Sequence, residues 1–65
     1  MYLIKTRGTA KIPDYVQIRD NNFALLEHIT LNNINDFIDK SEFNNKQKIK
    51  GDLAAAPFGK IIKID

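Results

Sequence analysis

The chain contains no cysteine, no tryptophan and only one histidine among its 65 residues. Without cysteine it can form neither a disulfide nor a cysteine-based metal site, so nothing marks an oxidising compartment. His28 has no second histidine to help complete a metal coordination sphere, and we expect no metal and no cofactor. The three glycines form no phosphate-binding motif. Because most of the residues and motifs that commonly support catalysis are missing, we predict that the protein is not an enzyme.

Long hydrophobic runs are also missing. No stretch approaches the roughly 20 apolar residues that span a bilayer, and residues 1–5 lack the apolar run of a signal peptide. With 43% hydrophobic and 28% charged residues, the composition is typical of a globular protein, and the length leaves room for one small domain over residues 1–65. We therefore expect a soluble, cytoplasmic protein without a membrane partner.

The charges divide the chain into three parts, although the net charge is only +2. Residues 1–19 hold four basic residues and one acidic residue (+3), residues 20–45 one basic and five acidic (−4), and residues 46–65 five basic and two acidic (+3). Basic ends and an acidic middle are complementary in charge. The pattern therefore allows contact between two copies of the chain.

The N-terminal segment predicts a hairpin. Residues 2–12 are rich in β-branched and aromatic types, and Gly8 indicates either a bulge or an early end to this strand. Pro13 and Asp14 then predict a tight turn over residues 12–15, because proline presets the first central backbone angle and aspartate tolerates the second. The chain is expected to reverse here.

A second and a third strand are expected over residues 15–19 and 23–29. In the second strand, Val16 and Ile18 alternate with polar residues and form the core face. The register with the third strand has two alternatives. A two-residue turn at residues 21–22 creates two cross-strand pairs, Ile18 with Leu25 and Val16 with Glu27. A longer loop turns two other residues toward the core, Ala24 and Leu26.

After Thr30 the spacing of hydrophobic residues changes from two toward the 3.6 of a helix. The first helix is expected to begin near Asn33, whose side chain can cap it. A second helix follows Ser41 or Asn44, either of which can cap it, and ends at Pro57. Its predicted buried residues are Ile49, Leu53 and Ala56. Residues 60–64 alternate again and predict a last strand, with Ile62 and Ile64 on one face.

The predicted fold is α+β, with the order β-β-β-α-α-β and a small antiparallel sheet of three or four strands. Both short helices are expected to pack on one face of this sheet. An antiparallel sheet can leave its other face open to water. We predict that five side chains stand on that open face: Lys5, Arg7, Tyr15, Gln17 and Arg19.

Two functions fit this fold. The first is a non-catalytic interaction module whose partner is another protein or a second copy, since a small core gains stability by burying more apolar surface. In a homodimer, the two copies are expected to meet along an exposed edge strand. The alternative is nucleic-acid binding, in which cations contact phosphates and an aromatic ring stacks on bases. The residues predicted for that alternative are Lys5, Arg7, Tyr15 and Arg19, joined by Lys46, Lys48 and Lys50.

Overall fold

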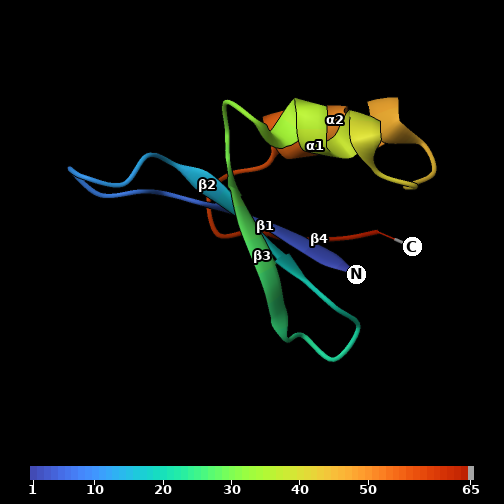
Figure 1. Cartoon of the computed structure of the whole chain (residues 1–65), viewed down its shortest axis with the longest axis horizontal. Coiled ribbons are helices and arrows are strands. Elements are labelled where there is room, and N and C mark those ends of the chain that lie inside the picture. Colours follow the sequence, from blue (N-terminus) through green and yellow to red (C-terminus); the bar gives the residue numbers. More distant parts are fainter. Residues whose placement is uncertain (65) are drawn as a thin grey trace.

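The protein is represented by a computed structural model that describes residues 1–64. Its elements follow the predicted order: β1 (Tyr2–Thr6), β2 (Tyr15–Arg19), β3 (Leu25–Thr30), α1 (Ile34–Lys40), α2 (Lys46–Ala55) and β4 (Ile61–Lys63). The four strands form one antiparallel sheet in the order β3-β2-β1-β4, so the last strand pairs with the first. Figure 1 shows both helices together on one side of the sheet. The predicted α+β class is confirmed.

The hydrophobic core lies between the sheet and the two helices. The strands contribute Leu3, Val16 and Ile18, each at most 2% exposed. The helices contribute one buried pair each, Ile34 and Ile38 from α1, and Ile49 and Leu53 from α2. The predicted burial of Val16, Ile18, Ile49, Leu53 and Ala56 is confirmed, and Ile64 is buried as well. This layer leaves the opposite face of the sheet without a covering element.

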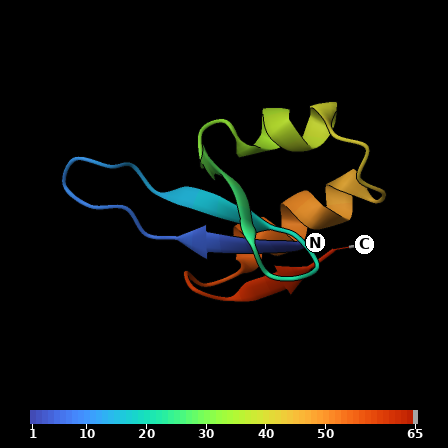
Figure 2. The same cartoon turned by 60° about the horizontal axis from the view of Figure 1, so that its bottom comes forward.

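The connection between β1 and β2 differs from the predicted tight turn. Strand β1 ends at Thr6, and a loop over residues 7–14 reverses the chain and projects beyond the sheet (Figure 2). Inside this loop the Gly8 amide donates a hydrogen bond to Asp14 Oδ1 at 2.7 Å. The Thr9 amide donates to the Ile12 carbonyl at 2.8 Å. The loop therefore satisfies part of its backbone internally, and only the early end of the strand, indicated by Gly8, was anticipated.

The connection between β2 and β3 is a longer loop than two residues, and both predicted registers are wrong. The Phe23 amide donates to the Asp20 carbonyl at 2.9 Å, and Phe23 itself adopts a left-handed backbone with φ of 64°. This is the turn followed by a left-handed residue that is common in such hairpins. A further irregularity between Ile18 and Arg19 shifts the pairing. The resulting partners are Ile18 with Glu27, Val16 with Ile29, and Arg19 with Leu25.

The helix boundaries follow the prediction, but the caps do not. Asn33 precedes α1 without any side-chain capping bond. Asn45, rather than Ser41 or Asn44, precedes α2, and it too makes no such bond. The Ser41 hydroxyl instead donates back to the Ile38 carbonyl at the end of α1. Helix α2 ends at Ala55, before Pro57. Packing of the buried faces, more than capping, therefore holds these short helices in place.

Candidate interaction surfaces

Strand β3 forms a long free edge of the sheet. It has six residues and pairs only with β2, whereas the opposite edge, β4, has three. Leu25 and Leu26 at its start are 52% and 55% exposed. An edge strand presents unpaired backbone donors and acceptors to its surroundings. We call residues 25–30 the β3 edge.

The antiparallel pattern specifies which backbone groups face outward from the β3 edge. The Leu31 amide donates to the Asp14 carbonyl at 3.0 Å, and these two residues continue the register of β2 and β3. Directly opposite residues alternate between hydrogen-bonded and non-hydrogen-bonded pairs. Leu31 therefore belongs to a hydrogen-bonded pair with β2, and so does every second residue before it, Ile29 and Glu27. The backbone N–H and C=O of His28, which lies between them, point away from β2. His28 therefore directs both its N–H and its C=O to the free edge.

The uncovered side of the sheet, which we call the open face, carries positive charge only. Residues opposite one another across strands share a face, so the pairing places eleven strand residues here: Tyr2, Ile4, Thr6, Tyr15, Gln17, Arg19, Leu25, His28, Thr30, Ile61 and Lys63. The formally charged members are Arg19 and Lys63, both cations. Tyr2 lies between them, because it is the partner of Arg19 on one side and of Lys63 on the other.

Aromatic rings gather near this row. The Tyr2 and Phe23 rings meet edge to face with centroids 5.6 Å apart. The Arg19 guanidinium lies 4.6 Å from the Phe23 ring centroid and donates to the Phe23 carbonyl at 2.9 Å. It also donates twice to Gln17 Oε1. The Arg19 side chain therefore links Phe23 in the turn to Gln17 in strand β2. Among the described residues it has no carboxylate partner.

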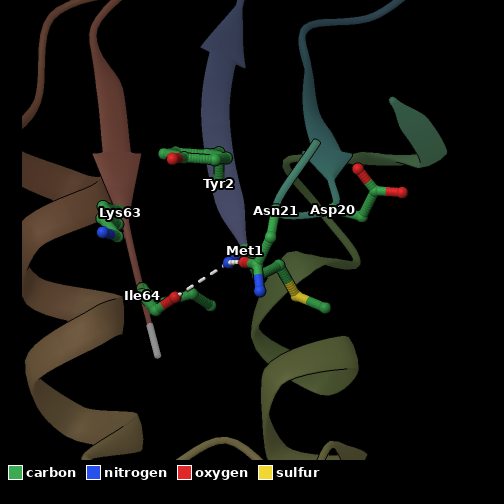
Figure 3. Close-up of a pocket in the computed structure, with 6 residues that line it drawn as sticks. All are labelled: Met1, Tyr2, Asp20, Asn21, Lys63 and Ile64. Atoms are coloured by element: carbon green, nitrogen blue, oxygen red, sulfur yellow. Dashed lines mark hydrogen bonds between the residues drawn. The ribbon is translucent and has the colours of Figure 1, made fainter. Parts of the chain in front are cut away.

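Figure 3 shows the sheet end beside this row, where the start of β1, the end of β4 and the β2–β3 loop line an open hollow. Tyr2 and Lys63 lie on one side of the hollow, and Asn21 of the β2–β3 loop lies across from them. The Met1 nitrogen donates to the Ile64 carbonyl at 3.1 Å and to Asn21 Oδ1. Asp20 is engaged in the loop, where its carboxylate accepts from the Asn22 and Ala24 amides. The polar groups of the hollow therefore mainly bind one another or the adjoining loop.

The predicted placement of Lys5 on the open face is wrong. Lys5 follows Leu3 by two residues and pairs with Val16, so it lies on the helix-covered face. Its ammonium lies 3.4 Å from the Ala54 carbonyl of α2 and 5.3 Å from the Phe58 ring centroid. Arg7, beyond the end of β1, places its guanidinium 4.3 Å from the same centroid. We call Lys5, Arg7 and Phe58 the Phe58 cluster.

Arg7 is likewise not on the open face, and the other three of the five predicted members are correctly placed. Tyr15, Gln17 and Arg19 follow one another at two-residue spacing along β2, on the side opposite to buried Val16 and Ile18. The Tyr15 ring meets the His28 ring edge to face, with centroids 5.6 Å apart. Tyr15 therefore contacts the β3 side of the open face, whereas Arg19 lies toward the row with Tyr2 and Lys63.

The three helical lysines form a separate group. The Lys46 ammonium donates to the Asp39 carbonyl at 2.8 Å, and Lys50 forms an ion pair with the Asp39 carboxylate. Lys48 pairs with Asp52 one turn further along α2 at 2.8 Å. The seven residues predicted for nucleic-acid binding thus fall into three places: the open face, the Phe58 cluster and the helix layer. They do not form one surface.

Tyr2, Phe23 and Lys63 are open-face neighbours that the sequence interpretation did not select. Tyr2 could have been found, because it alternates with Leu3 and must face away from the core if Leu3 faces inward. Lys63 required the pairing of β4 with β1. Phe23 required the left-handed turn geometry, which no local pattern predicted.

Among residues 1–64, no group of three or more histidine, cysteine, aspartate or glutamate side chains is arranged to hold a metal ion. None of the helices in that range is long and apolar enough to cross a membrane. Comparison with family models, curated proteins and solved structures found no match in any of the three.

Proposed function

We propose that the protein is a non-catalytic interaction module that associates with a second copy of itself through the β3 edge. The observation that carries this proposal is the combination of outward-facing backbone groups and exposed leucines on one strand. Unprotected edges of this kind pair readily with another strand. The cysteine-free composition is compatible with a reducing, cytoplasmic setting.

The contrast between the two edges of the sheet supports the choice of β3. Natural proteins protect edge strands by keeping them very short or by placing lysine or proline on them. Strand β4 has three residues and contains Lys63. Strand β3 has twice that length and the sequence LLEHIT, which contains neither lysine nor proline. Its own protection consists of the irregularity next to Leu25 and of Glu27 on the helix-covered face. A second strand paired with β3 would cover the longer of the two edges.

Association is tested by measuring molar mass with light scattering over a wide range of protein concentration. We expect a dimer, and we expect Leu26→Lys to raise its dissociation constant at least about tenfold, because one desolvated lysine per copy opposes pairing by more than about 1.4 kcal/mol. The matched control is Ile61→Lys, since Ile61 is 52% exposed but lies on β4. A wild-type chain that stays monomeric at every concentration contradicts the proposal.

Nucleic-acid binding is the second candidate, and the row of Lys63, Tyr2 and Arg19 is the observation that favours it. Single-stranded nucleic acids bind proteins through cations that contact phosphates and aromatic rings that stack on bases. This row offers both on a face where the charged strand residues are cations. It differs from the set predicted by sequence, because Lys5 and Arg7 belong to the Phe58 cluster.

A fluorescence titration with mixed-sequence single-stranded oligonucleotides tests this second candidate. Two phosphate contacts predict a slope of about −1.4 for the logarithm of affinity against that of salt concentration, or about a sevenfold loss between roughly 50 and 200 mM salt. Arg19→Gln combined with Lys63→Gln should abolish the salt dependence. Lys46→Gln combined with Lys48→Gln removes the same charge from α2 and serves as control. Equal weakening by both pairs argues against the open face as the binding site.

A further inference from the structure

We infer that two copies pair antiparallel along the β3 edge, with the two-fold axis midway between the two copies of His28. This extends the proposed self-association to a defined register. In this arrangement His28 of one copy lies opposite His28 of the other. The two sheets join into one continuous eight-stranded sheet, because four antiparallel strands come from each copy. The inference rests on the proposed function, and its test separates the two.

The symmetry of the pairing limits the choice of register. Side chains that lie opposite each other in a sheet point to the same face. A two-fold axis perpendicular to the sheet keeps each residue on its own face, so only pairs of residues separated by an even number can oppose one another. One residue must therefore lie directly opposite its own copy, with the axis midway between the two. We call this an axis through that residue. Within the regular part of β3, the candidates are Glu27, His28 and Ile29.

Like charges argue against an axis through Glu27. That register places the two Glu27 carboxylates directly opposite each other, and like charges in this position destabilise a sheet. Glu27 belongs to a hydrogen-bonded pair with β2, so at a shared edge it would form a non-hydrogen-bonded pair, in which side chains approach most closely.

Backbone hydrogen bonding argues against an axis through Ile29. That register directs the His28 amide to the Thr30 carbonyl of the other copy. The Thr30 carbonyl already accepts from the Asn33 amide at 3.0 Å in the turn that leads to α1. An axis through His28 instead joins the N–H of each His28 to the C=O of the other. This central pair satisfies both outward-facing groups of the residue. The Thr30 carbonyl is then needed only at the two ends of the interface, where Thr30 meets Leu26, whereas an axis at Ile29 needs it in every hydrogen-bonded pair within residues 25–30.

The side chains are compatible with this register. His28 is exposed on the open face, and Glu27 comes to lie opposite Ile29 of the second copy, so no two like charges are directly opposed. Leu26 comes opposite Thr30, which covers one of the most exposed leucines. Because the axis is perpendicular to the sheet, both open faces lie on the same side of the dimer. The arrangement closes with two copies, as isologous interfaces do.

Single cysteines test the register, because the natural chain contains none that could form a competing disulfide. Opposed residues in a hydrogen-bonded pair have Cα atoms about 5.5 Å apart, within the range of about 4.4–6.8 Å for a disulfide. We expect His28→Cys to form a disulfide-linked dimer on mild oxidation, with most chains linked. Glu27→Cys and Ile29→Cys alone should link at least about tenfold less, since each is about 8 Å from its own copy. Mixed together, these two variants should link to each other.

The outcomes separate the inference from the proposal beneath it. A wild-type chain that is monomeric by light scattering overturns the proposed self-association and the register with it. A dimer in which Glu27→Cys or Ile29→Cys links to itself more efficiently than His28→Cys moves the axis and overturns the register alone. A dimer in which none of the three links also overturns it. Circular dichroism of the reduced variants checks that each is folded, and both Glu27 and His28 are exposed.

Discussion

Leu3→Ala is expected to reduce the free energy of unfolding by about 2–5 kcal/mol, the range for large-to-small substitutions in well-packed cores. Leu3 is 0% exposed and lies on the central strand β1, between β2 and β4 and beneath the helices. A domain of 65 residues has a total stability of only about 3–10 kcal/mol. The variant should therefore lose a large share of the total stability and unfold at a clearly lower urea concentration than the wild type.

Urea denaturation followed by circular dichroism measures this loss. The matched control is Ile61→Ala, because Ile61 lies on neighbouring β4 but is 52% exposed. We expect this control to lower stability by less than about 1 kcal/mol. If Leu3→Ala is no more harmful than Ile61→Ala, the core does not lie between the sheet and the helices as described.

Gly8→Ala should destabilise the protein by about 2–4 kcal/mol, through overpacking together with the loss of a loop hydrogen bond. A Cβ atom on Gly8 would lie 1.9 Å from the Ile12 carbonyl oxygen and 2.7 Å from that of Pro13. These neighbours are backbone atoms, so no rotamer change can relieve the contact. The loop must move, and the bond from the Gly8 amide to Asp14 is then lost.

Gly51→Ala is the control for the glycine substitution itself. Gly51 lies in α2 and is exposed, and a Cβ atom added to it would have no heavy atom outside its own helix within 4 Å. Alanine is favoured over glycine inside a helix by about 0.8–1 kcal/mol, so this variant should be more stable than the wild type. Opposite shifts in the urea midpoint are the expected result. Two shifts of the same sign would contradict the close approach of the loop backbone to Gly8.

The sequence predicted the elements well where a hydrophobic period governs local structure. Strand β2 has the predicted bounds, since Val16 and Ile18 alternate with polar residues. Helix α2 buries the predicted Ile49 and Leu53 and stops before Pro57. Both outcomes depend on interactions within a few residues. The cap positions failed because Asn33 and Asn45 form no side-chain capping bonds, although their residue types favour such bonds.

The surfaces were harder to predict, because each depends on which strands become neighbours. Lys5 was assigned to the open face, yet its two-residue spacing from buried Leu3 places it under the helices. The two-residue spacing of Leu3 and Lys5 is visible in the sequence. Placing Lys5 also required knowing that Leu3 faces the core and that β1 ends at Thr6, and the sequence analysis did not predict these two features together. Phe58, which Lys5 and Arg7 approach, lies more than fifty residues away along the chain.

The element order, the α+β class and most of the core follow from the sequence, because hydrophobic periodicity and proline act over short distances. The cross-strand register and the composition of the two surfaces depend instead on tertiary structure. The left-handed Phe23 and the shifted pairing at Ile18 move every later partner of β3, which a local pattern does not encode. That register turns the His28 backbone outward, and the pairing of β1 with β2 and β4 brings Lys63, Tyr2 and Arg19 into one row.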